Sequence, residues 1–89
     1  MASTLEAMME SLRQAKVSEL LLSTATTLAS VAYGKLELGD LPEAKLAIDA
    51  ISATLGLLRD HADSTMLRDF EQALTGLQLA YAQAASAKP

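Results

Sequence analysis

One junction near the middle of the chain constrains the fold more than any other feature. The segment Gly39 to Pro42 holds, in order, residues that end one helix and begin the next. Glycine readily adopts the left-handed conformation that closes a helix. Asp40 can cap the following helix, with Glu43 three residues later as in a capping box, and a proline in the first turn removes no helical hydrogen bond. The junction therefore predicts two helices joined by a short turn.

The helix after this junction is expected over residues 41–59, because apolar residues recur there three or four positions apart. Its main face holds Leu41, Ala44, Ile48, Ile51, Leu55 and Leu58, and a weaker second stripe holds Leu46, Ala50, Ala53 and Leu57. Gly56 lies inside this helix and costs about 1 kcal/mol relative to alanine, unless another backbone approaches closely there.

The helix before the junction is expected over residues 18–37, with Ser18 as its cap and Val17 packing on Leu22. Apolar residues cover more than half of its circumference, which favours cover on more than one side. One strip contains small residues, and it fits either close approach of another helix or a solvated edge. This strip consists of Ser23, Thr27, Ser30 and Gly34.

A third amphipathic helix is expected over residues 64–85, with Asp63 or Ser64 as its cap. Residues 86–89 should form a frayed tail. Its apolar face holds Met66, Leu67, Phe70, Ala73, Leu74, Leu77 and Tyr81.

Residues 1–16 form a separate helical arm in this interpretation, ahead of a helical domain over 17–85. Continued through Val17 as one helix, the apolar face of the arm would point almost opposite to the main apolar face. Either the helix breaks near residues 14–18, or the arm continues straight and touches something other than the main core. The expected fold is all-α, a three-helix antiparallel assembly with an N-terminal helical arm. The face of the arm holds Leu5, Met8, Met9, Leu12 and Ala15.

The composition argues against several classes of function. The net charge is −4 at pH 7 and the seven basic residues are scattered, which argues against nucleic acid and anionic membrane surfaces as partners. Glu6 and Glu10 lie where a secretion signal would be basic and then apolar, and no uncharged run reaches the ~18 apolar residues of a membrane span. No cysteine is present, which suits a reducing cytoplasm and excludes thiolate metal sites.

The sequence offers few groups for catalysis. His61 is the only histidine, and it lies in a loop between Asp60 and Asp63. Zinc sites use three or four protein ligands, and serine nucleophiles need a base, so the expectation is a non-enzymatic protein without metal or cofactor. The alternative is a small-ligand or metal-binding protein that uses the loop around His61.

Three segments together resemble a known family. They are the Leu-, Ser-, Thr- and Ala-rich stretch over 20–36, the Asp-Leu-x-x-Ala-x-x-Ala-Ile-Asp motif over 40–49, and the final amphipathic helix. With them the chain resembles DUF1844, a small bacterial family of unknown function, over roughly residues 17–83. Two segments depart from the family pattern, namely Lys35 to Gly39 and the loop around His61. The resemblance implies a bacterial, helical protein and brings no catalytic residues.

The exposed apolar surface predicts self-association. The apolar arc of the first strong helix is too wide for two neighbours to cover, and the arm adds a second apolar face. A homodimer is the commonest way to bury such a surface. A different protein partner remains the other possibility. The residues expected at the interface are Leu5, Met8, Met9, Leu12, Leu21, Leu28 and Val31.

Overall fold

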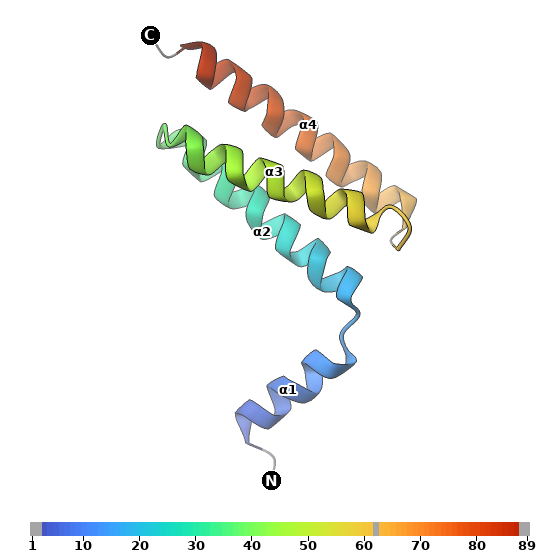
Figure 1. The fold of residues 1–89 in the computed structure, drawn as a ribbon. Helices are drawn as coiled ribbons and strands as arrows, with labels where there is room; N and C mark the ends of the chain where they lie inside the picture. Colours follow the sequence, from blue (N-terminus) through green and yellow to red (C-terminus); the bar gives the residue numbers. More distant parts are fainter. Residues whose placement is uncertain (1–2, 62, 88–89) are drawn as a thin grey trace.

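The computed structural model describes residues 3–61 and 63–87, and within them the chain is all-helical. The four helices are α1 (Thr4–Gln14), α2 (Val17–Glu37), α3 (Leu41–Leu58) and α4 (Ser64–Ala87). Helices α2, α3 and α4 pack lengthwise, each antiparallel to the next, while α1 projects away from them (Figure 1). The prediction of an all-α, three-helix packing with an arm is confirmed for the described residues.

The helix is interrupted between α1 and α2, which decides between the two arrangements that the sequence left open. Ala15 and Lys16 both have extended backbones, with ψ angles of 140° and 135°. Two consecutive extended residues interrupt the helical hydrogen bonds and change the direction of the chain. Among the described residues, α1 packs against no other helix. The arm is therefore a separate element at the end of a two-residue linker.

The turn between α2 and α3 follows the expected pattern. Gly39 has a φ angle of 76°, the left-handed conformation expected of it. Its N–H donates to the Leu36 carbonyl at 3.1 Å, and the Asp40 N–H donates to the Lys35 carbonyl at 2.9 Å. These two bonds form a Schellman motif, which satisfies carbonyls that a helix end would otherwise leave unpaired. The Asp40 carboxylate then accepts the Glu43 N–H at 3.4 Å, so the predicted cap of α3 is confirmed.

The predicted cap of the preceding helix is wrong. The N-cap position of α2 belongs to Lys16, which makes no side-chain capping bond, and Ser18 lies inside the first helical turn. The extended backbone at Lys16 sets this boundary, because helical dihedrals begin directly after it. At the start of α4, the Asp63 carboxylate accepts the Thr65 N–H at 2.7 Å. Of the two predicted caps, Asp63 and Ser64, it is therefore Asp63 that supplies the capping side chain.

The core is centred on α3, which supplies six of the ten buried apolar residues. Helices α2 and α4 each contribute two, and both pack along α3. The sequence favoured cover on more than one side of the helix over 18–37, but α2 places only its alanines at full burial, because α3 and α4 cover one part of its circumference. The buried residues are Ala25, Ala32, Ala44, Ala47, Ile48, Ile51, Leu55, Leu58, Leu67 and Leu77.

Helix α4 differs from its prediction at both ends. Met66, assigned to the apolar face, is 46% exposed, and Ala73 is also exposed. Both residues lie at the edge of that face, where the neighbouring helices do not reach. At the other end, the helix continues to Ala87 and so includes the first two residues of the segment expected to fray.

Candidate interaction surface

Helix α1 is stabilised by local interactions alone. Ser3 caps it by accepting the Glu6 N–H at 3.1 Å. Glu10 pairs with Arg13 at 2.7 Å and accepts a hydrogen bond from the Gln14 amide at 3.0 Å. Such pairs at three- and four-residue spacing support an isolated helix by a few tenths of a kcal/mol each. The arm is thus helical and charged on one side without help from the bundle.

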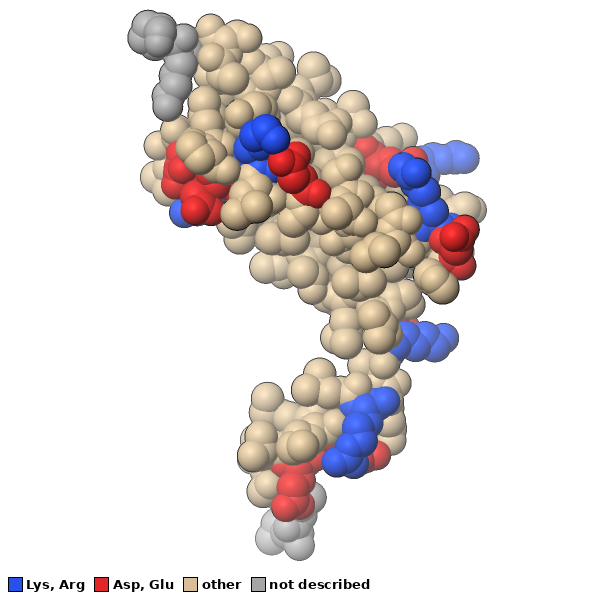
Figure 2. Space-filling view, in the orientation of Figure 1, with Lys and Arg blue, Asp and Glu red and all other residues tan. Residues whose placement is uncertain are grey.

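The opposite side of α1 is apolar and uncovered. Leu5, Met8, Met9 and Leu12 are 47–66% exposed, and no described residue of α1 is buried. Charged residues of the arm gather toward one side in Figure 2, which leaves uncharged surface on the other. All four predicted interface residues of the arm therefore lie together on one free apolar face.

The three predicted interface residues of α2 divide into two kinds. Leu21 and Leu28 are half-buried and pack against the core of their own chain. Val31 is 43% exposed, and it lies on the flank of α2 that points away from α4. Val31 thus offers the most exposed surface of the three, while Leu21 and Leu28 offer the edges of their side chains.

These α2 residues belong to a larger apolar surface, named here the open face. Helix α4 packs against both α2 and α3 and so covers one side of this pair (Figure 1). The helical period places the residues of the open face on the side that α4 leaves uncovered. Val17 and Leu57 line the same hollow, which shows that the two helices meet there. The open face consists of Val17, Leu20, Leu21, Thr24, Leu28 and Val31 of α2 and Leu46, Ala50 and Leu57 of α3.

A partner that covers the open face does not need to supply hydrogen bonds to it. Thr24 donates its hydroxyl to the Leu20 carbonyl at 2.8 Å. Thr54, half-buried beside the face, likewise donates to the Ala50 carbonyl at 2.8 Å. Because these hydroxyls are bonded within their own helices, the threonines can present methyl groups outward. No residue of the open face is charged, so burying it desolvates no ion.

The α3 part of the open face was missed in the predicted interface. Leu46 and Leu57 are 65% and 66% exposed, more than any predicted interface residue of α2. The signal was present in the sequence as the weaker stripe of α3, at helical spacing. Sequence alone could not show that this stripe lies beside the free flank of α2, because that depends on which side α4 covers.

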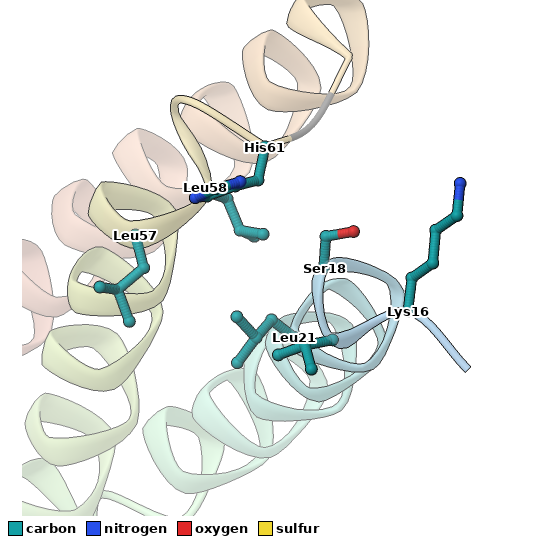
Figure 3. A pocket seen from close by; sticks show the side chains of 7 residues that line it. Lys16, Ser18, Leu21, Leu57, Leu58 and His61 are labelled. Carbon is teal, nitrogen blue, oxygen red and sulfur yellow. The ribbon is translucent and has the colours of Figure 1, made fainter. Parts of the chain in front are cut away.

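His61 lies at one end of the open face, beside a hollow of about 430 Å³ between the start of α2 and the end of α3. Figure 3 shows Leu21 and Leu58 on the walls of this hollow, and the Lys16 ammonium extends away from them. The His61 N–H donates to the Leu58 carbonyl at 2.9 Å, and its side chain is exposed. Across residues 3–61 and 63–87, no three His, Cys, Asp or Glu side chains gather as metal ligands do.

Two other surface features have a weaker link to binding. A shallow apolar groove between α2 and α4, with Ile51 at its floor, has a volume of about 240 Å³. In the strip of small residues on α2, Ser23, Thr27 and Ser30 are exposed and Gly34 is half-buried, but a Cβ at Gly34 would meet no atom within 4 Å. Within one chain, this strip is therefore a solvated edge and no helix approaches it.

Comparison with known proteins identifies no relative. No protein-family model matches the chain, and neither a curated protein nor a solved structure matches it. The resemblance to the DUF1844 family therefore stays a prediction from the residues quoted above. Within the described part of the chain, none of the helices combines the length and apolar character needed to cross a membrane.

Proposed function

We propose that this protein acts by self-association as a homodimer, and that it is not an enzyme. The observation that carries the proposal is the free apolar face of α1, which packs against no other helix in the part of the chain that the structure describes. An amphipathic helix gains most of its stability from packing its apolar face. A second copy of the chain supplies a surface for that face, since each copy also carries an open face.

The proposed interface adds the α3 residues of the open face, and Val17, Leu20 and Thr24 of α2, to the one expected from the sequence. It uses Leu5, Met8, Met9 and Leu12 of the arm, together with the open face of α2 and α3. Leu21 and Leu28 contribute only at their edges, because the core holds most of each side chain. The proposed setting is the cytoplasm, since a chain without cysteine needs no oxidising compartment to fold or assemble.

Light scattering at micromolar concentration tests the proposal. The expected mass is twice the 9.4 kDa of one chain. Leu12→Glu and Val31→Glu should each shift the equilibrium toward monomer, because each places a charge on an apolar interface. Val31 is preferred to Leu28 for this purpose, since Leu28 packs against the core and its replacement would also destabilise the fold.

The matched control is Gln72→Glu, which places the same charge on the exposed outer side of α4. It should leave the mass unchanged, and circular dichroism should show full helix content for all three variants. A wild-type mass near 9.4 kDa across the concentration range would reject the homodimer.

The hollow beside His61 supports a second candidate function, the binding of a small apolar ligand. It is lined by apolar side chains with His61, Ser18 and Lys16 at its margin. Such a combination of apolar walls and a few polar groups is typical of ligand sites. His61→Ala should abolish uptake of a ligand or metal under this alternative. Under the homodimer proposal the same variant should leave the mass and the fold unchanged.

A further inference from the structure

Helix α1 matches about half of the open face in length, and it matches the face in chemistry. The apolar face of α1 extends from Leu5 to Leu12, seven residues that span ~10 Å at 1.5 Å per residue. The open face runs along α2 from Val17 to Val31, fourteen residues or ~21 Å, and its half from Thr24 to Val31 spans the same ~10 Å as the face of the arm. Both surfaces are uncharged along this length. One arm therefore has the length to cover about half of the open face.

The open face has the position that a fourth helix takes in a helical bundle. Helix α4 lies on one side of the α2–α3 pair, and the other side is bare. Ridges of one helix pack into the groove between two others, which buries apolar side chains on all three. The described residues include one helix without a packing partner, and that helix is α1.

The linker directs α1 away from the open face of its own chain. Ala15 and Lys16 are the only residues between the two helices, and both are extended. To fold back along α2, the arm would need this short connection to form a tight reversal. In the extended geometry, α1 is instead held away from its own bundle, where another molecule can receive it (Figure 1).

We propose that two copies of the chain exchange their arms, so that α1 of each copy lies on the open face of the other. This inference rests on the proposed self-association and adds its geometry. The exchange of an identical element between protomers is a low-cost route to a dimer, and by symmetry each contact in it is made twice. One arm alone offers four Leu or Met side chains, and a stable interface buries about 800 Å² per partner. Reciprocal exchange places both arms and both open faces in the interface.

The orientation leaves the charged side of the arm in water. Glu10 and Arg13 remain paired with each other on the outer side of α1. No ion is desolvated by the exchange, which avoids the cost of burying an unpaired charge. The apolar side chains of the arm meet Thr24, Val31 and Leu46 of the partner.

Cysteine cross-linking of the full-length chain tests the exchange, because the chain contains no cysteine of its own. Met8→Cys is placed on one chain and Thr24→Cys on a second, tagged chain, and the two are produced together. A short bismaleimide should link them into a covalent heterodimer that contains both chains. The control replaces Thr24→Cys by Gln72→Cys, on the outer side of α4, and should give no linked product.

The outcomes separate this inference from the proposal on which it rests. A dimer by light scattering that gives no Met8–Thr24 link between chains overturns the exchange and leaves self-association standing. A monomer by light scattering overturns both. The double variant Met8→Cys and Thr24→Cys on one chain should link mainly between molecules. A link confined to single chains at high dilution would show that the arm folds back onto its own bundle, and would also overturn the exchange.

Discussion

Lys35 and Asp40 are joined twice across the turn between α2 and α3. The Asp40 N–H donates to the Lys35 carbonyl at 2.9 Å, and the Lys35 ammonium lies 3.9 Å from the Asp40 carboxylate. In a Schellman motif these two positions commonly make a hydrophobic contact. Here an exposed ion pair takes that place, while the same carboxylate also caps α3. Because the Asp40 N–H is bonded to Lys35, the capping box expected with Glu43 is only half formed.

Replacing Asp40 should separate its two roles. Asp40→Ala removes the cap of α3 and the ion pair, and should lower the free energy of unfolding by about 0.5–2 kcal/mol. Asp40→Asn keeps a capping oxygen and removes the charge, so its loss should be within the ~0–1 kcal/mol of an exposed ion pair. Urea unfolding followed by circular dichroism, at one fixed protein concentration, measures both. Equal losses for the two variants would contradict the capping role.

Two glycines should respond to alanine in opposite directions. Gly39 has a φ angle of 76°, so Gly39→Ala forces a side chain into the left-handed region and should destabilise the fold by about 1–2 kcal/mol. Gly56 lies within α3, and a Cβ there would meet no atom within 4 Å. Gly56→Ala should therefore stabilise the fold by about 1 kcal/mol. Denaturant midpoints for the two variants should lie on opposite sides of the wild-type value.

Adjacent leucines at the end of α3 should separate folding from association. Leu58 is fully buried and Leu57 is 66% exposed. Leu58→Ala should cost about 2–5 kcal/mol of stability, as buried leucines do. Leu57→Ala should change the stability of the single chain by within about 0.5 kcal/mol, since it removes no core contact. If the open face is an interface, Leu57→Ala should nevertheless raise the dimer dissociation constant in analytical ultracentrifugation, and no change would remove Leu57 from the interface.

The stabilisation from the exposed ion pair Lys45–Asp49 should be lost at high pH. The hydrogen bond from the Lys45 ammonium to Asp49, at 2.8 Å, raises the pKa of Lys45 above its ordinary value of 10.5. A raised pKa in the folded state means that this stabilisation is complete below pH 10.5 and is lost as the pH rises through the folded-state pKa. Asp49→Asn should bring the pKa of Lys45 down toward its ordinary value in an NMR titration of the lysine side chains. An unchanged pKa would show that the pair does not persist in solution.

The parts of the fold that were predictable from sequence depend on local chemistry. The turn at Gly39 and Asp40 needs only one left-handed residue and one capping carboxylate, and both can be identified in the sequence. The same holds for the apolar period of α3, whose main face became the centre of the core. Ser18 shows the limit of such arguments, because this suitable capping residue lies within the first turn of a helix whose start is set by the extended backbone of Lys16.

The candidate site was less predictable because it depends on tertiary packing. The free face of the arm could be predicted from Leu5, Met8, Met9 and Leu12 alone, since all four lie on one short helix. The exposed part of the Leu28 side chain could not be predicted, because the position of α4 decides which flank of α2 is covered. The exposed Leu46 and Leu57 were missed for the same reason.

The hydroxyl of Thr24, already bonded to the Leu20 carbonyl, has a consequence for selectivity. An interface that offers neither polar partners nor charges along its length has no feature that rejects a neighbouring alignment. A helix displaced by one turn, ~5.4 Å, would still find leucine, valine and methyl groups beneath it. Selection of a single alignment then depends on the ends of the open face, where Lys16 and His61 lie at one end and Lys35 and Glu43 at the other. Charge changes at these four positions should alter which helices the face accepts, while the middle of the face sets only how tightly they are held.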